Sequence, residues 1–391
     1  AMEEETKRVS FVRDSEISVT ESVYEADGDE LNIVTLTDDD KFDHSPRLAA
    51  DDGKALLVWT KSEGLGFTLG EEMKALRSPA NSDRLFYSRW DGNTWSVPEE
   101  IEGSLPTVLD SNLTMHEEEG LLLYTLDMDN DQSTQEDQEL FYRFYDGNSW
   151  SAAVRLTDNE MADSNPKAVW INGEWFITWY QSGSVLYKAG LDGETKAEEF
   201  LAKVQDDYEI AVMEGANPQL ALVYRQSGGN NTRIISTSFY DIEKCTWSDE
   251  IPLTEEEGYI RSFSPLFTEE GRLNIVYTQA EVIEKVIEGA EYLTPSDKVD
   301  MLILNYTPVH DLALEEEDGL QLSPGNPLPG TVASVSAIIR NHGDFAESAT
   351  LYLYDGNPSE GRLIGEVTTD DPIPARSFVQ VEVDWLVGSE E

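Results

Sequence analysis

Two stretches of this sequence carry the same phrase: LFYSRWDGNTWSVPEEI, from Leu85 to Ile101, and LFYRFYDGNSWSAAVRL, from Leu140 to Leu156. Both begin with an aromatic and apolar run that alternates with a period of two, which is typical of a β-strand. An Asp-Gly-Asn turn follows, and a tryptophan then opens a second extended run. Each phrase therefore predicts a strand, a tight turn and another strand.

The phrase forms half of a longer repeat, because another predicted hairpin precedes each copy. Five of these preceding hairpins recur at intervals of 44 to 67 residues, and they begin at Asp43, Asp110, Asp163, Asp207 and Ser262. Two hairpins make a four-stranded antiparallel sheet, and a repeat of this length is typical of propeller blades. We expect an all-β chain with a β-propeller over residues 16–308, and five blades are favoured over a larger ring.

The last repeat supplies only three strands, which end near Pro308. The missing strand is expected from DELNIVTLTDD, residues 29–39, because joining the two ends of the chain in one blade closes the ring and removes an exposed edge. Residues 280–293 have a helical spacing within a loop insertion. Residues 1–15 are expected to be a leader or a cloning remnant.

Proline marks the innermost strands. Pro46, Pro166 and Pro265 recur at one position of the first strand of three repeats. Proline has no backbone N–H, so it is confined to strands at the edge of a sheet. The strand that lines a propeller channel is such an edge.

The chain is strongly acidic, with 78 acidic against 27 basic side chains and a net charge of −51. A polyanion of this kind repels nucleic acid and anionic lipid, so we expect neither partner. The single cysteine, Cys245, excludes an internal disulfide framework. No apolar run approaches the roughly 20 residues that span a bilayer, so a membrane-spanning chain is not expected.

The sequence pattern changes after Pro308, where short predicted strands with alternating apolar residues are separated by Gly and Pro turns. VSAIIRNHGD (Val335 to Asp344), TLYLYDGNP (Thr350 to Pro358) and VEVDW (Val381 to Trp385) resemble the bacterial cell-adhesion-related domain, CARDB. The resemblance covers residues 309–388 and implies an immunoglobulin-like β-sandwich without an enzymatic role. It also implies an extracellular or cell-surface setting in a prokaryote, as a monomeric part of a longer multidomain chain.

The repeats resemble the sialidase or Asp-box superfamily only in outline. An Asp-box places its aspartate two residues before a glycine, whereas Asp91 directly precedes Gly92 and Asp146 directly precedes Gly147 here. No sialidase residue is therefore carried over to this chain.

The starts of the first strands form a candidate ligand site. A period of two points Asp43, Ser45 and Arg47 in one direction, so the channel wall should be polar with carboxylates at its mouth. Aspartates that cap the same turn in each blade are the structural alternative. The candidate ligand-binding residues are Asp43, His44, Arg47, Asp110, Asn112, Asp163, Asn165, Lys167 and Asp207.

One loop has the composition of a cation site. In DMDNDQSTQEDQE, aspartates alternate and a distal acid follows, and calcium prefers six to eight oxygen ligands. Gln132 and Gln138 replace the glycine and the glutamate of an EF-hand loop, so an acidic loop without an ion is the alternative. The candidate calcium ligands are Asp127, Asp129, Asp131, Ser133 and Glu139.

Three functions fit these features. The first is a non-catalytic surface binding or adhesion module, in which the propeller recognises a glycan or a surface protein and the sandwich is a spacer. The second is a glycoside-active propeller that uses Asp43 and Asp163, with Asp207 or Glu209 as a further candidate, because hydrolysis needs two carboxyl groups. The third is a purely structural spacer. The sequence favours the first. We expect no certain cofactor, and calcium is the candidate.

Overall fold

The structure is a computed structural model that describes most of the chain and divides into two compact units, residues 1–210 and 211–391. The all-β prediction is confirmed, since the one helical element of the described part is the 3-10 turn η1 (Gly229–Asn231). In that same part, no helix is both long and apolar enough to cross a membrane. The described residues are 6–13, 16–25, 28–39, 41–62, 83–131, 134–191, 196–200, 204, 207–214, 218–242, 244–255, 258–287, 290–314 and 319–388.

The first unit begins with a separate antiparallel sheet of three strands, β1 (Thr6–Arg13), β2 (Glu16–Glu25) and β3 (Gly28–Thr35). We had expected residues 29–39 to complete the last repeat, and this is wrong. β3 pairs along its whole length with β2, from Gly28 opposite Glu25 to Thr35 opposite Ser18. The short turn between the two strands makes this local pairing available before any distant one.

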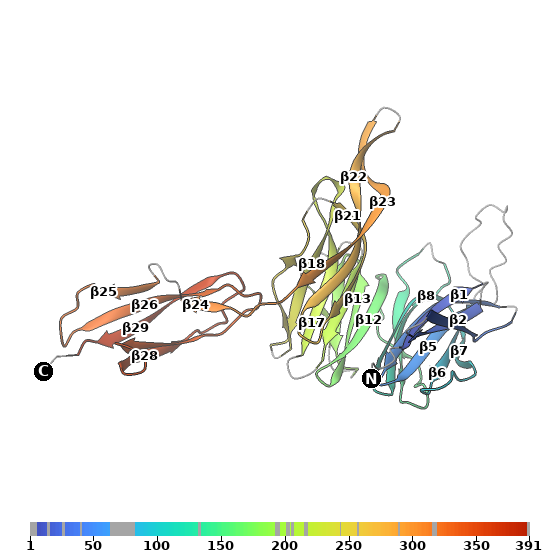
Figure 1. Ribbon diagram of the computed structural model, residues 1–391, viewed down its shortest axis with the longest axis horizontal. Coiled ribbons are helices and arrows are strands. Elements are labelled where there is room, and N and C mark those ends of the chain that lie inside the picture. Colours follow the sequence, from blue (N-terminus) through green and yellow to red (C-terminus); the bar gives the residue numbers. More distant parts are fainter. Residues whose placement is uncertain are drawn as a thin grey trace. The chain divides into compact units, whose positions relative to one another are not determined.

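Three four-stranded antiparallel sheets follow, each with its strands in chain order, as the double hairpin predicts (Figure 1). Asp91 and Asp146 begin the turns, and Gly92 and Gly147 adopt the positive φ that these turns require. The strands are β4 (Phe42–Asp51), β5 (Lys54–Ser62), β6 (Asp83–Trp90) and β7 (Glu99–Leu105); β8 (Thr107–His116), β9 (Glu119–Asp127), β10 (Gln138–Tyr145) and β11 (Val154–Arg155); β12 (Asp163–Ile171), β13 (Glu174–Gln181), β14 (Ser184–Ala189) and β15 (Glu198–Glu199).

The three sheets are packed face to face. Successive residues of a strand point to opposite faces, so the apolar run of β9 serves two cores. Leu122 and Tyr124 pack with Leu56 of the preceding sheet, and Leu121 packs with Ile177 of the next sheet. All five side chains have at most 1% of their surface exposed. A strand buried on both faces loses its alternation, which is why β9 is almost continuously apolar.

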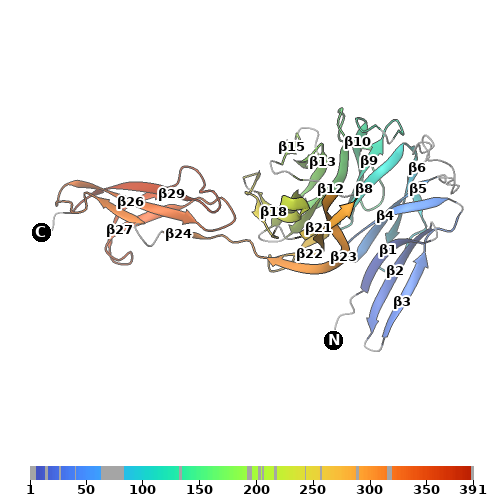
Figure 2. The same cartoon turned by 90° about the horizontal axis from the view of Figure 1, so that it is seen from above.

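The first strands of these sheets, β4, β8 and β12, lie side by side at the inner edge (Figure 2). Each pairs with the second strand of its own sheet, and among the described residues no strand pairs with its other side. The edge position that Pro46 and Pro166 predict is therefore confirmed. Pro265 also lies on the first strand of a repeat, opposite Ile275.

The second unit contains most of a larger sheet, whose first strand, β16, starts at the end of the first unit. We expected residues 280–293 to be helical, and this is wrong, because residues 280–287 belong to β22 and residues 290–293 to β23, the two strands of a long hairpin (Figure 1). Val282, Ile283 and Val286 are β-branched, and this favours a strand over a helix. The strands of the sheet are β16 (Tyr208–Met213), β17 (Gln219–Ser227), β18 (Arg233–Asp241), β19 (Thr246–Trp247), β20 (Ile251–Pro252), β21 (Gly258–Phe267), β22 (Leu273–Ile287) and β23 (Ala290–Tyr306).

The C-terminal part of this unit forms two further sheets around one core. The larger sheet has the order β24-β26-β25 with β29 paired to β26, and the smaller sheet is the hairpin of β27 and β28. Val335 and Val381 of the larger sheet pack with Leu351 and Leu353 of the smaller one. The strands are β24 (Leu312–Leu314), β25 (Leu320–Ser323), β26 (Val332–Asn341), β27 (Thr350–Asp355), β28 (Arg362–Thr368) and β29 (Phe378–Leu386). The predicted domain boundary at residue 308 stays a prediction.

Candidate functional site

A β-bulge determines which side chains of β4 face the inner edge. The pairing with β5 shifts between His44 and Arg47, where β4 has one extra residue. An extra residue reverses the alternation of side chains, so residues before and after it no longer share a face. Asp43 is fully buried, whereas the Arg47 side chain is 39% exposed. Our prediction that Asp43, Ser45 and Arg47 point in one direction is wrong for this reason.

A β-bulge of the same kind occurs in β12, where the register of pairing with β13 shifts between Ser164 and Lys167. Asp163, before the shift, is fully buried, and Lys167, after it, is partly exposed. In β8 the shift comes earlier, before Asp110. Asp110 therefore stays on the partly exposed face and is the one of these three aspartates that solvent reaches.

Asp43 is held inside its own sheet. Its Oδ1 accepts a hydrogen bond of 2.9 Å from Trp59 Nε1, and Lys61 Nζ lies 3.6 Å from the same oxygen. Burial raises the pKa of Asp43, and the positive charge of Lys61 acts against that rise. No part of this side chain reaches solvent, and these two partners lie on β5, so we assign Asp43 a structural role in holding β4 against β5.

Asp163 has the equivalent place in the third four-stranded sheet. Gln181 Nε2 donates to Oδ1 at 2.6 Å, and Asn159 Nδ2 donates to Oδ2 at 2.8 Å. Burial raises the pKa of Asp163, although hydrogen bonds from Thr157, Gln181 and Asn159 lower it. Asp43 and Asp163 were the predicted glycosidase pair, and we do not assign either of them contact with a substrate.

His44 belongs to a buried polar chain that links two sheets. Its Nε2 lies 3.0 Å from Ser62 Oγ, which donates to Asp83 Oδ1 at 2.6 Å. The other oxygen of Asp83 accepts from the backbone N–H of Val108 on β8 at 2.8 Å. Since the one proton of Ser62 is directed to Asp83, the arrangement is not that of an activated nucleophile. Burial lowers the pKa of His44.

Arg47, Asn112 and Lys167 occupy equivalent positions of β4, β8 and β12, each of them partly exposed. Each reaches toward the next inner strand. Arg47 Nε donates to the carbonyl oxygen of Ser111 at 2.6 Å, and its Nη2 lies 3.2 Å from Asp110 Oδ1. Asn112 Oδ1 accepts from a backbone N–H of β12 at 3.1 Å. Three of the predicted ligand-binding residues thus form one polar row.

The row continues to β16. Lys167 Nζ lies 2.8 Å from Oε1 of Glu209, and Glu209 is 33% exposed. The hydroxyl of Tyr208 donates to the carbonyl oxygen of Asn165 at 2.7 Å and accepts from Thr178 Oγ1 at 3.1 Å. Asn165 therefore contributes its backbone to the structure that holds the row. We call Arg47, Asp110, Asn112, Lys167 and Glu209 the inner polar row.

Tyr208 is a fully buried tyrosine that lies between Asp207 and Glu209 in the sequence. Burial raises the pKa of Tyr208 well above its usual value, and the negative charges of Glu209, Asp110 and Asp207 raise it further. Asp110 comes from β8, while Asp207 and Glu209 flank Tyr208 at the start of β16. Tyr208 itself was not predicted, and its place between two acids was the available signal.

The predicted calcium loop gathers a different set of ligands. Carboxylate oxygens of Asp127, Asp129 and Asp137 all lie within 4.8 Å of one another. Glu139 does not join them, because it accepts from Thr157 Oγ1 at 2.6 Å and lies 3.0 Å from an Arg155 nitrogen. The backbone carbonyl of Asp131 accepts from Thr134 within the loop. Ser133 lies outside the described residues.

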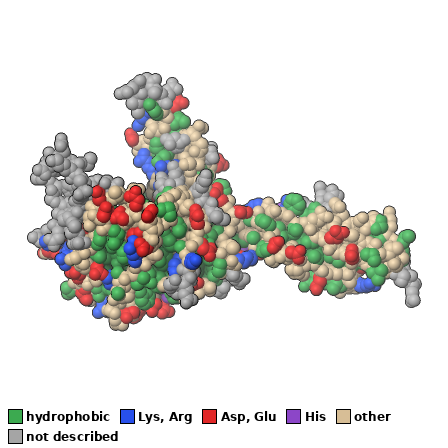
Figure 3. Space-filling model, turned by 180° about the vertical axis from the view of Figure 1, so that it is seen from behind, with side chains coloured by type: hydrophobic (Ala, Val, Ile, Leu, Met, Phe, Trp, Pro, Cys, Tyr) green, Lys and Arg blue, Asp and Glu red, His purple; other side chains and the backbone are tan. Residues whose placement is uncertain are grey.

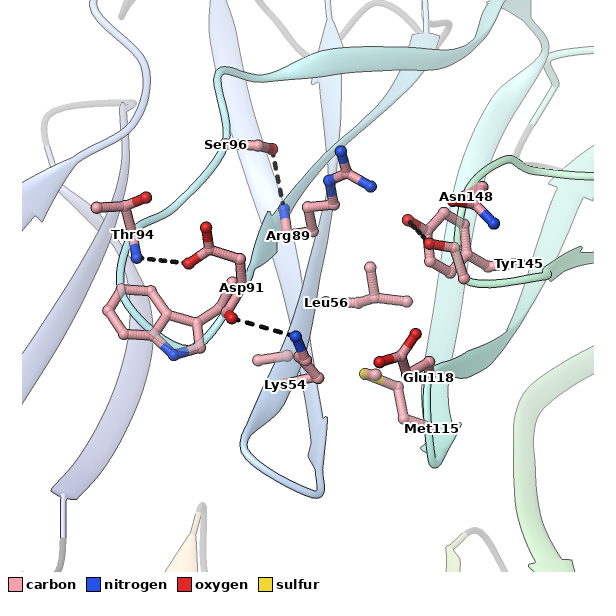
Figure 4. Close-up of a pocket in the computed structure, with 13 residues that line it drawn as sticks. Lys54, Leu56, Arg89, Asp91, Thr94, Ser96, Met115, Glu118, Tyr145 and Asn148 are labelled. Carbon is pink, nitrogen blue, oxygen red and sulfur yellow. Dashed lines mark hydrogen bonds between the residues drawn. The ribbon is translucent and has the colours of Figure 1, made fainter.

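A cavity of about 370 Å³ lies at the opposite ends of the first two four-stranded sheets (Figure 4). Its lining includes Lys54, Arg89, Asp91, Glu118 and Tyr145. Asp91 caps its own turn, since its Oδ1 accepts from the backbone N–H of Asn93 and of Thr94, both at 2.8 Å, and these bonds lower its pKa. A carboxylate held in this way is a poor proton donor, so we do not place the site in this cavity.

Acidic side chains outnumber basic ones across the displayed surface, in agreement with the net charge of −51 (Figure 3). The inner polar row is an exception, because Arg47 and Lys167 each accompany one carboxylate there. The inner polar row thus has two basic and two acidic side chains within a strongly acidic protein. Such a row offers both hydrogen-bond donors and acceptors, which suits a ligand rich in hydroxyl groups.

The comparisons with known proteins give structural likenesses alone, since no model of a known protein family and no curated protein matches this sequence. A Trypanosoma rangeli sialidase in complex with sialic acid has 10% identity over 75% of this chain and 50% of its own, with a TM-score of 0.45. The same sialidase with the inhibitor DANA has 8% identity over 95% and 78%, with a TM-score of 0.46. Exo-β-1,3-galactanase from Phanerochaete chrysosporium has 10% identity over 88% and 90%, with a TM-score of 0.34.

These likenesses are distant, and the chain spans about half the length of the first sialidase chain. The similar structures are glycoside hydrolases, and this finding overturns our prediction of a non-catalytic binding or adhesion module in favour of the glycoside-active alternative. With TM-scores below 0.5, they bring no residue roles to this chain. The resemblance of residues 309–388 to CARDB stays a prediction.

Proposed function

We propose that the chain is a carbohydrate-active β-propeller that hydrolyses glycosidic bonds at its inner polar row. The observation that carries the proposal is the pair of partly exposed carboxylates in the inner polar row, Asp110 and Glu209, each of which lies next to a basic side chain. Hydrolysis of a glycoside uses two carboxyl groups, one to protonate the leaving oxygen and one to attack or to activate water. Buried acids cannot reach a sugar, whereas Asp110 and Glu209 are each about one-third exposed.

The partners of the two acids suggest their roles. Asp110 Oδ1 accepts from Arg47 and from the backbone N–H of Ser111, at 3.2 and 2.8 Å. Two donors on one oxygen fix the orientation of this carboxylate, as a nucleophile or base requires. Glu209 pairs with the flexible side chain of Lys167, and we assign it the second carboxyl group of the reaction. Asn112 and Lys167 would then bind sugar hydroxyls.

The proposal includes the architecture around the site. We infer five blades, of which the sheets that begin with β4, β8 and β12 supply three. β16 to β20 and β21 to β23 supply the other two, and the latter blade has three strands. Residues 309–388 would form an immunoglobulin-like module outside the active site. An extracellular or cell-surface setting in a prokaryote, as one part of a longer chain, belongs to the same proposal.

The test is hydrolysis by the purified full chain on a polysaccharide panel that includes sialosides and β-1,3-galactan. We expect release of new reducing ends, and a fall of at least about 100-fold in rate for Asp110→Asn and for Glu209→Gln.

Glu100→Gln is the matched control, because Glu100 is a partly exposed glutamate paired with an arginine, Arg84, on the outer strands of a sheet. Its activity should equal that of the wild type. Absence of product on the whole panel, or full activity of Asp110→Asn and Glu209→Gln, would contradict the proposal.

A further inference from the structure

The loop between β9 and β10 brings three carboxylates together. Oxygen atoms of Asp127, Asp129 and Asp137 lie within 4.8 Å of one another, one acid at the end of β9 and two in the loop. The backbone N–H of Asp129 donates to Asp137 Oδ2 at 2.7 Å, so the backbone itself holds two of the acids in place. Like charges at this separation repel, and this arrangement needs a positive charge to offset them.

Asp127 provides a second and independent observation. The residue is fully buried, and among the described residues neither of its carboxylate oxygens meets a hydrogen-bond donor. Asp137 Oδ1 is also buried without a donor. A buried carboxylate is normally paired or bound to a metal, because an unpaired one carries the full cost of desolvation. Three buried carboxylate oxygens of this cluster therefore lack a partner within the described residues.

No cationic side chain of the described part supplies that charge. None of the three acids forms an ion pair with a lysine, arginine or histidine there. The sequence agrees, since it has no basic residue between His116 and Arg143.

We propose that Asp127, Asp129 and Asp137 bind one calcium ion. All three donors are carboxylate oxygens, which calcium and magnesium prefer and which zinc or copper does not select. The donors come from an irregular loop, and calcium tolerates such flexible geometry whereas magnesium demands a near-ideal octahedron. Backbone carbonyls and water would complete the ligand set. This site is separate from the inner polar row and does not depend on the proposed hydrolysis.

The bound ion would fix the loop against the start of β8. Asn130, within the loop, accepts from the backbone N–H of Thr107 at 2.9 Å, and Asp127 pairs with Thr107 across the sheet. Thr107 lies three positions before Asp110 on the same strand. Calcium would therefore make rigid the strand that carries one acid of the inner polar row.

The experiment is calorimetric titration of the full chain, freed of metal with a chelator, with calcium chloride and separately with magnesium chloride. We expect one saturable calcium event, weaker heats with magnesium, and a melting temperature that rises with calcium. Asp127→Asn and Asp137→Asn should weaken calcium binding by roughly 100-fold. Glu136→Gln removes an exposed charge of the same loop outside the cluster and should bind calcium as the wild type does.

A second measurement separates loss of the site from loss of the fold. Without calcium, Asp127→Asn should melt above the wild type, because it removes a buried and unpaired charge. Absence of saturable calcium binding to the wild type, or wild-type binding by both aspartate variants, would overturn the proposal. A preference for magnesium over calcium would overturn the choice of ion.

Discussion

Asp163 and Asp127 are both fully buried aspartates of the first unit, and they differ in what surrounds their oxygens. Asp163 accepts one amide donor on each oxygen, from Gln181 and Asn159, so its charge is solvated by the protein. Asp127 has no donor on either oxygen among the described residues. Burial alone therefore does not distinguish a structural acid from a ligand. The partners do, and the predictions below test that distinction.

The largest effect is expected from Asp163→Ala. It leaves the partly buried amides of Gln181 and Asn159 without their acceptor and opens a cavity, which should cost about 3 kcal/mol of the free energy of unfolding. Chemical denaturation measures this difference. Asp158→Ala is the control, because its side chain is 83% exposed, and we expect a change within about 0.5 kcal/mol. A loss below about 1 kcal/mol for Asp163→Ala would remove the structural role that we assign to it.

A smaller effect is expected from Asn130→Gly, which tests whether the calcium loop is attached to β8 through this side chain. Asn130 has a φ of 59°, and glycine adopts that angle without strain, so the variant removes mainly the bonds to Thr107. We expect a loss of about 1 kcal/mol in denaturation of the calcium-free protein. Calcium affinity should also fall, since the loop loses its attachment. Unchanged stability would mean that the loop holds its shape independently.

The smallest effect is expected in the pH dependence of the free energy of unfolding, which we compare between the wild type and Asp43→Asn. Burial raises the pKa of Asp43 in the folded protein, so the folded state holds this proton more tightly than the unfolded chain does. Ionisation therefore costs stability as the pH rises through and above the ordinary aspartate range. The free energy of unfolding of the wild type, relative to Asp43→Asn, should fall as the pH rises from below the ordinary aspartate pKa of 3.8 to neutral pH. The variant keeps an oxygen for the hydrogen bond from Trp59, and a rising difference would contradict the assigned pKa direction.

Sequence patterns predict the sheets well and the bulges poorly. The hairpin phrase locates β6 and β10 within one or two residues, because alternation and the Asp-Gly turn are local signals. A bulge comes from how two strands pair, so neither strand shows it alone. This is why Asp43 was predicted to share a face with Arg47 and does not, and a bulge of the same kind separates Asp163 from Lys167.

The candidate sites show the same limit. Asp127 and Asp129 follow from their alternate spacing, but Asp137 does not, because the EF-hand template places the last ligand at Gln138 and the prediction took the next acid, Glu139. Glu139 lies inside β10 and is directed to Thr157 of the next segment. Asp110 and Glu209 belong to strands that lie far apart in the sequence, β8 and β16, so no local pattern places them in one row.

The bulges of β4 and β12 make these two strands unusually sensitive to a change of length by one position. Deleting the residue at Pro46 or Pro166 would restore simple alternation downstream. Either the buried aspartate before the deletion would then become exposed, or the exposed basic side chain after it would become buried. Substitutions at these prolines leave the residue count intact, so these strands should tolerate a substitution far better than the deletion of one residue. The number of residues between the aspartate and the following cation therefore matters more than which residues they are.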